Sequence, residues 1–488
     1  MMTTVPDHRI RAGNRESLNR QGRYVLYWMT AFRRLGWNYS LQHAADLSRR
    51  LEKPLVILEA LLVDYPFASF RFHHFLLQGM AERKAALRAK EPVHYPFVER
   101  RKGDGDGLLE ALAGEACCVV ADDFPSFFIP RMLAAAGRGV RVRMELVDSN
   151  GLLPLQLPER EFSSAYHFRR YLQKVLPDHL PEYPDPSPLS ESLPAGDALI
   201  PEGIRTRWPQ VPADLLAGSP EALSRLPLDR SPTAVALPGT SHGARNALER
   251  FLGEGLPRYH QDRNHPDHSA TSGLSPYLHF GLISSHEVFS AVSEAEGWTP
   301  LRLSSRTDGK REGWWGMGPG AEAFLDQIIT WRELGFNMTS RREDYADYTS
   351  LPEWARKTLA HHQGDPRPHL YTLEEFRDAE THDRLWNAAQ RQLLEEGVIH
   401  NYLRMLWGKK ILEWSPSARD ALEVMLELND SLALDGRDPN SYSGIFWCLG
   451  RYDRGWPERP IYGKVRSMSS DATTRKVKLD KYMERFSS

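Results

Sequence analysis

The sequence predicts an α/β protein with two domains, in which a doubly wound parallel sheet is followed by an all-helical domain. Two observations indicate this fold. The first 150 residues alternate short apolar, β-branched runs with helix-like stretches. After about residue 243, apolar residues recur at the three-to-four spacing of helices. The length of 488 residues also exceeds what one ordinary core supports, so two domains are expected.

Buried strands are expected in the first half, because short and nearly continuous apolar runs are typical of a parallel sheet covered on both faces. These runs are Tyr24–Met29, Leu55–Leu58, Cys117–Ala121 and Val140–Val147. Helices are expected at Tyr39–Leu51, Phe67–Lys90 and Arg131–Gly137. The alternation of strand and helix assigns residues 20–176 to the doubly wound domain.

A proline-rich tract follows. Six prolines fall between Pro177 and Pro194, and more follow up to Pro220. Because proline blocks regular hydrogen-bond ladders, residues 177–242 are predicted to form an interdomain connector. Residues 243–488 then form the helical domain. Its expected helices are Ala244–Leu252, His286–Glu296, Ala321–Met338, Leu385–Glu396 and Tyr402–Trp414.

Composition excludes several classes of protein. No apolar run reaches the roughly 18 residues that span a bilayer, and the polar N-terminus lacks the apolar segment of a secretory signal. Cys117, Cys118 and Cys448 cannot form a disulfide framework. We therefore expect a cytoplasmic protein, a monomer with no membrane partner. The motifs GxxxxGK[ST] and HExxH are absent. His361, His362 and His369 lack a metal-ligand spacing, so no metal is expected.

Two features each leave two interpretations open. From Arg451 to Arg485, ten basic and five acidic residues give a local positive excess, which is either a solvated surface or a phosphate-binding one. Trp407 and Trp414 share one face of an expected helix, about 10 Å apart along its axis. With Trp386 on the preceding helix, they form either ordinary core or a ladder that passes an electron hole from a redox cofactor to the surface.

Several long stretches resemble DNA photolyases and cryptochromes, and they occur in the order found in that family. The sequence is most similar to class II photolyases at Asn401–Met405, Lys409–Trp414, Leu434–Asn440 and Gly463–Arg466. The other matching stretches are Leu274–Gly281 and Thr381–Gln390. The resemblance covers the C-terminal half and implies a flavoprotein with FAD in an all-helical domain.

By this resemblance, one set of residues holds FAD. It comprises Tyr259, Thr271, Ser272, Gly273, Leu274, Ser275, Asn401, Arg404, Asp435 and Gly436. Small hydroxyl residues before a helix suit a pyrophosphate, although the same run also serves as a plain helix cap. Arg404 and Asp435 correspond to an ion pair beside the flavin ring, and Asn429 corresponds to an asparagine that faces flavin N5.

The resemblance also assigns roles in electron transfer and in DNA binding. Trp414, Trp386 and Trp407 correspond to the proximal, middle and distal members of a photoreduction chain, with Leu406 in place of a usual tyrosine. Trp331 and Trp447 correspond to the pair that holds a flipped pyrimidine dimer. Arg454, Lys464 and Arg466 correspond to basic residues that enter the damaged duplex.

This chain departs from the family pattern in two places. Gln327 stands where the family normally has a glutamate that binds the thymine edge, one helical turn before Trp331. Residues 30–38 replace a Ser-Arg-Asp-Gln-Arg segment near the domain that holds the antenna chromophore. A second chromophore of the deazaflavin type therefore stays an open question.

We expect a light-driven DNA repair enzyme, a carbon-carbon lyase that acts on UV-damaged DNA. Photoexcited reduced FAD would donate an electron to a cyclobutane pyrimidine dimer, whose ring then opens. Two alternatives remain. One is a cryptochrome-like blue-light photoreceptor without repair activity, which Gln327 favours. The other is repair of (6-4) photoproducts.

Overall fold

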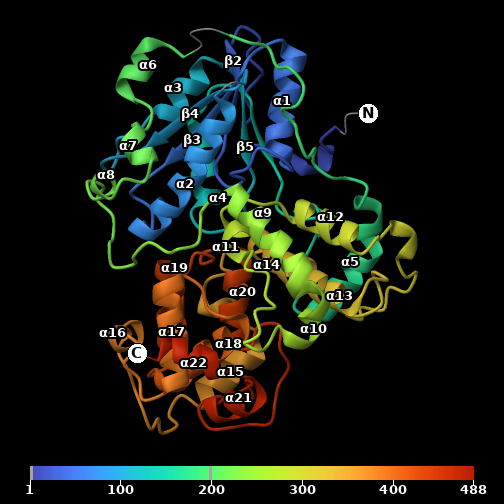
Figure 1. The fold of residues 1–488 in the computed structure, drawn as a ribbon, viewed down its shortest axis with the longest axis vertical. Helices are drawn as coiled ribbons and strands as arrows, with labels where there is room; N and C mark the ends of the chain where they lie inside the picture. Colours follow the sequence, from blue (N-terminus) through green and yellow to red (C-terminus); the bar gives the residue numbers. More distant parts are fainter. Residues whose placement is uncertain (1–3, 89, 197–199, 488) are drawn as a thin grey trace. The chain divides into compact units, whose positions relative to one another are not determined.

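The computed structural model describes residues 4–88, 90–196 and 200–487, which fold into two compact units (Figure 1). The sheet unit comprises Met1–Leu157, Leu176–Asn246 and Pro276–Ala291. The helical unit comprises Pro158–Val175, Ala247–Ser275 and Val292–Ser488. Ala89, in an expected helix, and residues 197–199, in the expected connector, lie outside the described residues. The α/β and all-helical fold class is confirmed.

The sheet unit contains a mostly parallel sheet with the strand order β1-β6-β5-β2-β3-β4. Only the edge pair of β1 and β6 is antiparallel among the described strands. The strands are β1 Ile10–Ala12, β2 Tyr24–Trp28, β3 Leu55–Leu61, β4 Val93–Val98, β5 Ala116–Asp122 and β6 Met144–Val147. Each expected strand is present, although β6 begins only at Met144.

Alternate residues of the central strand β2 face two different cores. Tyr24 and Leu26 point to the core under α3 and α4, whereas Val25 and Tyr27 point to the core under α1. Figure 1 shows α1 and α3 on opposite sides of the sheet. Burial on both faces explains why the strands are continuous apolar runs. The helices of this part are α1 Tyr39–Leu51, α2 Phe70–Leu87, α3 Leu108–Gly114 and α4 Ile129–Gly139.

The proline-rich tract packs onto the sheet unit. Ile200 and Trp208 are buried in the core under α3, and Leu189 and Leu193 in the core under α1. The tract contains the short helices α6 Glu202–Arg207, α7 Ala213–Leu216 and α8 Pro220–Leu223. It is followed by α9 Ser241–Arg250, and α12 Ser285–Ala295 begins in the same unit.

One buried carboxylate fixes the loop that follows β2. Asp122, at the end of β5, accepts hydrogen bonds from the backbone N–H groups of Thr30, Ala31 and Phe32 at 2.8, 2.8 and 2.9 Å. It also accepts one from the hydroxyl of Tyr27 at 2.8 Å. β2 and β5 are neighbours at the point where the strand order reverses, a usual ligand position in such sheets. The bound loop is the segment that departs from the family pattern.

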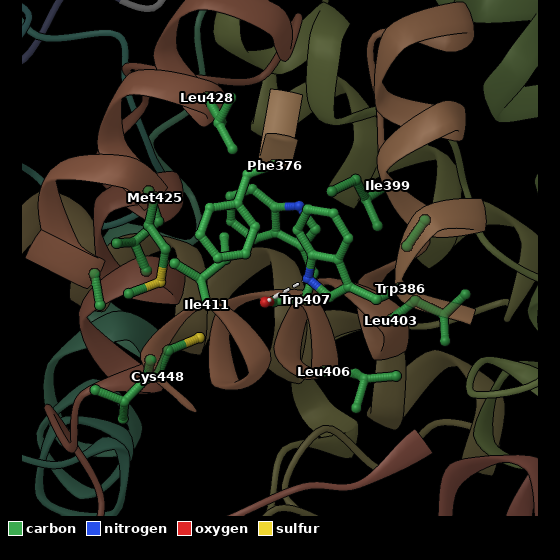
Figure 2. Close-up of a cluster of buried hydrophobic side chains, with 14 of the residues drawn as sticks. Phe376, Trp386, Ile399, Leu403, Leu406, Trp407, Ile411, Met425, Leu428 and Cys448 are labelled. Carbon is green, nitrogen blue, oxygen red and sulfur yellow. Dashed lines mark hydrogen bonds between the residues drawn. The ribbon is translucent and has the colours of Figure 1, made fainter. Parts of the chain in front are cut away.

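The helical unit is built around one large apolar core (Figure 2). Its largest fully buried side chains are Trp386, Trp407 and Trp414. The main helices around this core are α15 Glu353–His361, α17 Arg384–Glu396, α18 Asn401–Trp414, α19 Ala418–Leu432, α20 Pro439–Cys448 and α22 Asp480–Phe486. The other helices are α5 Ala165–His179, α10 Tyr259–Asp262, α11 Ser275–His279, α13 Pro319–Leu325, α14 Arg332–Arg341, α16 Leu373–Arg377 and α21 Ser470–Lys476.

The helix expected at Ala321–Met338 is not a continuous α-helix. A π-helical turn, η5 (Asp326–Trp331), separates α13 from α14. Such single π-turns within α-helices are frequent at functional sites. A second π-turn, η2 (Phe251–Gly255), follows α9. Among the described residues, no helix is long and apolar enough to cross a membrane.

Candidate functional site

Two tryptophans from different helices form an aromatic wall in the helical unit. The rings of Trp331, at the end of η5, and Trp447, near the end of α20, stack with centroids 4.6 Å apart and planes inclined by 14°. Both side chains are partly exposed. Gly335 permits this arrangement, because a Cβ there would lie only 2.7 Å from the carbonyl oxygen of Pro439. The glycine thus lets α14 and α20 approach closely.

Gln327 lies on the π-turn, four residues before Trp331, and is partly exposed. The neighbouring carboxylate of Asp326 is buried and accepts from Nε of Arg169 at 2.7 Å. The ion pair therefore neutralises the charge of Asp326, and Gln327 is the partly exposed polar residue of this turn.

Residues of α18, α19 and the loop after α19 form a polar group beside the core. Arg404 Nη2 donates to Asp435 Oδ1 at 2.7 Å, and both side chains are partly exposed. Asn429 donates from its amide nitrogen to Ser441 Oγ at 2.8 Å and to Asp430 Oδ1 at 2.9 Å. Because both N–H groups are used within the protein, this amide can offer a ligand only its oxygen.

The loop after α19 must carry glycine at position 436. A Cβ on Gly436 would lie 2.4 Å from the carbonyl oxygen of Asn429. The tight turn places Asp435 opposite Arg404. Asp430 is buried, and desolvation raises the pKa of its carboxyl. It holds the turn by accepting from the backbone N–H of Arg437 at 3.0 Å.

The expected phosphate-binding run is accessible. Thr271, Gly273 and Ser275 are exposed, while Leu274 is buried and anchors the run. Gly273 has a φ of +66°, and a Cβ built there would meet nothing within 4 Å. Exposed hydroxyls and backbone with open space around them fit a diphosphate. Tyr259 is buried and packs edge-on against Phe251 and Phe324, and desolvation raises the pKa of its hydroxyl. Asn401, at the start of α18, is exposed.

The three tryptophans of the expected chain form a connected row. Trp386 Nε1 donates to the carbonyl oxygen of Trp407 at 3.0 Å, as drawn in Figure 2. The ring of Trp386 contacts that of Trp414 edge-on, with centroids 6.1 Å apart. Trp407 Nε1 donates to Gln390 Oε1 at 2.9 Å. Trp386 therefore contacts both of the other tryptophans.

Two residues that the sequence did not single out adjoin Trp414. The rings of Tyr371 and His382 lie 5.7 and 5.0 Å from that of Trp414, centroid to centroid. Tyr371 Oη lies 2.6 Å from His382 Nδ1. His369 stacks on His382 with centroids 3.7 Å apart. Because these three residues lie outside the long helices, no periodicity signals them.

The basic residues near the C-terminus lie on a hairpin formed by residues 453–466, here called the basic hairpin. Arg459 and Gly463 exchange backbone hydrogen bonds of 2.9 and 2.8 Å across it. Arg454, Lys464 and Arg466 are exposed and make no ion pair within the described part of the chain. Trp456, which sequence reasoning missed, is 36% exposed and lies 5.6 and 4.9 Å from the guanidinium carbons of Arg454 and Arg466. Its position between two arginines in a short loop is the sequence feature that could have identified it.

His362 ties the basic hairpin to α15. Its Nδ1 lies 2.7 Å from Asp365 Oδ2, and its Nε2 lies 3.0 Å from Glu458 Oε1 on the hairpin. Hydrogen bonds to Glu458 and then Asp365 raise the pKa of His362. Asp365 also accepts from the backbone N–H of Ile461 at 2.8 Å. These contacts connect the end of α15 to the basic hairpin through His362.

A convergence of possible metal ligands occurs in the sheet unit, at His8, His179 and Glu182. Both rings lie within hydrogen-bond distance of one oxygen, Glu182 Oε2, at 3.1 and 2.8 Å. These two hydrogen bonds account for the arrangement.

Elsewhere in the same unit, partly exposed aromatic rings cluster in the loops after β3 and β5. They are Tyr65, Phe67, Phe127 and Phe128.

Comparisons with known proteins identify the family. The deoxyribodipyrimidine photo-lyase of Methanothermobacter thermautotrophicus is 34% identical over 483 residues, covering 98% of this chain and 97% of the relative. That of Oryza sativa subsp. japonica is 34% identical over 478 residues, covering 94% and 86%. The chain belongs to the deoxyribodipyrimidine photo-lyase family.

More distant relationships show the same family and fold. The photo-lyase of Potorous tridactylus is 30% identical over 479 residues, covering 96% of this chain and 82% of the relative. A crystal structure of a class III photolyase from Agrobacterium tumefaciens matches with a TM-score of 0.66 at 17% identity, over 96% of this chain and 87% of that one. That likeness shows the photolyase fold. No family model matches the chain.

Proposed function

We propose that this member of the photolyase family is a class II-like enzyme that binds FAD and splits cyclobutane pyrimidine dimers in UV-damaged DNA with light. One observation carries the proposal. A single helical unit combines a partly exposed aromatic wall, Trp331 and Trp447, with a buried row of tryptophans next to a polar group suited to a flavin. A binding protein for undamaged DNA would need neither the row nor the polar group.

The chain's own residues would hold FAD as follows. Thr271–Ser275 offer hydroxyl and backbone donors to the diphosphate. Arg404, held by Asp435, places a cation beside the ring system, where it favours an anionic reduced flavin. The Asn429 amide, whose nitrogen is already bonded, presents its oxygen to a ring N–H group. When bound and reduced, FAD supplies the electron that opens the dimer ring upon absorption of light.

The protein would position the lesion and the duplex. A flipped dimer needs an apolar surface, and the stacked pair of Trp331 and Trp447 offers its outer face, since the two rings lie against each other. Gln327 supplies one donor and one acceptor to the pyrimidine edge. The basic hairpin contacts phosphates through Arg454, Lys464 and Arg466, and Trp456 supplies a stacking face between two arginines.

For the tryptophan row, we propose the order Trp407, Trp386, Trp414 from the flavin site outward, the reverse of the order expected from the sequence. Trp407 lies three residues from Arg404 on α18, about one helical turn away. Trp414 lies ten residues from Arg404 and contacts the exposed side chain of His382. The row would carry an electron hole from the buried end to the surface.

A second chromophore of the deazaflavin type would find a planar aromatic surface in the sheet unit. Phe67 and Phe127, from the loops after β3 and β5, have φ angles of +65° and +62° and stack with centroids 6.3 Å apart. Bulky residues in this left-handed conformation are strained, and such strain concentrates at ligand sites. We propose this aromatic cluster as the antenna position.

The decisive experiment is illumination of the purified protein, with its flavin reduced, in the presence of an oligonucleotide that contains one cyclobutane dimer. We expect intact pyrimidines to accumulate in the light and not in a matched dark sample. An oligonucleotide with a (6-4) photoproduct serves as the control substrate. Repair of the (6-4) lesion alone would contradict the proposed substrate.

Gln327 supports one alternative, a photoreceptor without repair. An amide binds the thymine edge less strongly than a carboxylate does, because charge-assisted hydrogen bonds are roughly twice as strong as neutral ones. A photoreceptor would bleach its oxidised flavin under blue light but leave both lesions unchanged. The same illumination experiment therefore separates the two functions.

A further inference from the structure

The outer end of the tryptophan row leads to a tyrosine that is hydrogen-bonded to a histidine. Tyr371 and His382 both contact the ring of Trp414, and Tyr371 Oη lies 2.6 Å from His382 Nδ1. The same Oη accepts a hydrogen bond from the backbone N–H of His382 at 3.0 Å. The backbone N–H of Tyr371 donates to the carbonyl oxygen of Trp414 at 3.2 Å. Two hydrogen-bond contacts thus hold the phenol oxygen against His382, and a third holds the Tyr371 backbone against Trp414.

A phenol that loses an electron becomes a very strong acid, so its oxidation is favourable only where a base takes the proton. His382 Nδ1 is placed for this purpose. With Nδ1 unprotonated, the phenol donates to it along a short hydrogen bond. The backbone N–H of His382 then remains to stabilise the phenol oxygen after the proton has left. His382 therefore provides both the proton acceptor, Nδ1, and a backbone N–H that stabilises the oxygen of the oxidised phenol.

A positive charge is unfavourable on Trp414 itself. The ammonium of Lys410 lies 5.1 Å from its ring centroid, and a radical cation there would repel it. Glu413 pairs with Lys410 at 2.7 Å, which reduces this repulsion but leaves the ammonium over the ring. When Tyr371 loses both an electron and its phenol proton, the product is a neutral tyrosyl radical. The Lys410 ammonium does not repel this uncharged radical.

We propose that His382 is the proton acceptor that allows Tyr371 to take the electron hole from Trp414. The inference rests on the proposed photoreduction role of the tryptophan row. In the step, one electron passes from Tyr371 to the Trp414 radical cation, and the phenol proton passes to His382 Nδ1. The products are neutral Trp414, a neutral Tyr371 radical and a His382 imidazolium. Because His382 is exposed, that proton can then leave to water.

The surroundings keep His382 ready to accept a proton. Partial desolvation lowers the pKa of His382, and neighbouring His369 and Lys410 lower it further, while Asp383 and Glu413 act in the opposite direction. The ring is therefore neutral near pH 7, as an acceptor must be. Below its lowered pKa, His382 is already protonated and the step is blocked.

The test is flash excitation of the protein that carries oxidised FAD, with radicals followed by transient absorption and electron paramagnetic resonance. In the parent, a tryptophan radical should give way to a tyrosyl radical. His382→Asn keeps an oxygen acceptor near the position of Nδ1 but removes the base. We expect tyrosyl formation to slow by roughly a hundredfold in that variant. Deuterated solvent should slow the step in the parent and not the preceding tryptophan steps.

Matched variants identify the residue responsible. Tyr371→Phe should leave the radical on tryptophan. His369→Asn, which removes the stacked ring but not the base, should form tyrosyl radical at a rate within a few-fold of the parent's rate. Imidazole added to His382→Gly should restore the step in part.

Two outcomes would overturn the proposal. Tyrosyl formation in His382→Asn at the parent rate and without a solvent isotope effect would exclude His382 while leaving the tryptophan row intact. Absence of any tryptophan radical in the parent would remove the photoreduction row and this inference together. Dimer repair, measured separately, does not depend on either outcome.

Discussion

Position 327 determines how strongly the lesion pocket can hold a pyrimidine edge. Gln327 lies on a π-turn, and the adjacent carboxylate of Asp326 is already neutralised by Arg169 at 2.7 Å. A glutamate at position 327 would therefore not be repelled by an unneutralised carboxylate at position 326. The π-turn itself is not a feature that periodicity reveals, because it occupies only six residues between two α-helices.

Gln327→Glu should raise the dimer repair yield per absorbed photon several-fold. A charge-assisted hydrogen bond to the thymine edge should add about 1–2 kcal/mol over the amide. The measurement is the splitting yield of both proteins under identical illumination, with Gln327→Ala as the control that removes both functions of the amide. A parent yield that is high and falls in the glutamate variant would show that the pocket is built around the amide. A photoreceptor would stay inactive in all three proteins.

At the scale of single elements, the basic hairpin depends on one histidine. His362 contacts Glu458 on the hairpin and Asp365 beside it, and the backbone N–H of Lys464 donates to Thr358 Oγ1 on α15 at 3.0 Å. The protonated ring bridges two carboxylates. It both holds the hairpin and offsets the charge of Glu458, which would otherwise repel DNA phosphates.

Affinity for damaged DNA should fall as pH rises above about 6.5, the ordinary pKa of histidine. The folded-state pKa of His362 is raised, so its stabilising contribution is complete below the unfolded value and is lost as pH rises through the folded value. His362→Gln should bind DNA more weakly at low pH and show a flatter pH profile. Binding curves at several pH values and constant salt measure both. His361→Gln, an exposed neighbour, is the control and should retain the parent profile.

Several elements were predictable because their patterns are local. The expected helix Tyr39–Leu51 coincides with α1, and the expected Tyr402–Trp414 differs from α18 by one residue. In both, apolar residues repeat at helical spacing. Strand β4 was missed because Pro96 argues against a strand, yet β4 lies at the sheet edge, where proline is tolerated. Strand β1 is a short, mostly exposed edge strand that pairs only with β6.

The site could be predicted where its residues correspond to residues of the family that the chain resembles. The resemblance named Trp331 and Trp447, which are far apart in sequence and stack in the structure. It assigned no role to Tyr371, His382 or Trp456, whose proposed roles depend on contacts between loops. The resemblance implies Trp414 as the proximal member, whereas the opposite direction proposed above rests on the contact of Trp414 with the exposed ring of His382. Contacts of this kind follow from tertiary packing, which a single sequence does not display.

At the scale of the whole molecule, charge is distributed unevenly. The formal net charge is −2, yet the exposed arginines and lysine of the basic hairpin stand without ion pairs in the described part of the chain. A nearly neutral protein is not attracted to DNA by its net charge. Binding must therefore depend on this local surface, and its strength should reveal the number of phosphate contacts through its salt dependence.

Replacing both Arg454 and Arg466 with Ala should weaken damaged-DNA binding and flatten its dependence on salt. Each lost phosphate contact reduces the log–log slope by about 0.9 on duplex DNA, so two contacts should reduce it by about 1.8. The double variant Arg475→Ala with Lys476→Ala removes the same charge from exposed positions on α21 and is the matched control. Equal slopes in the parent and the hairpin variant would mean that the hairpin is only a solvated surface. An equal loss of affinity and slope in both double variants would mean that DNA binding depends only on the overall charge of the protein. A flatter slope confined to the hairpin variant would place the phosphate contacts beside Trp456, where both guanidinium groups already lie against the indole.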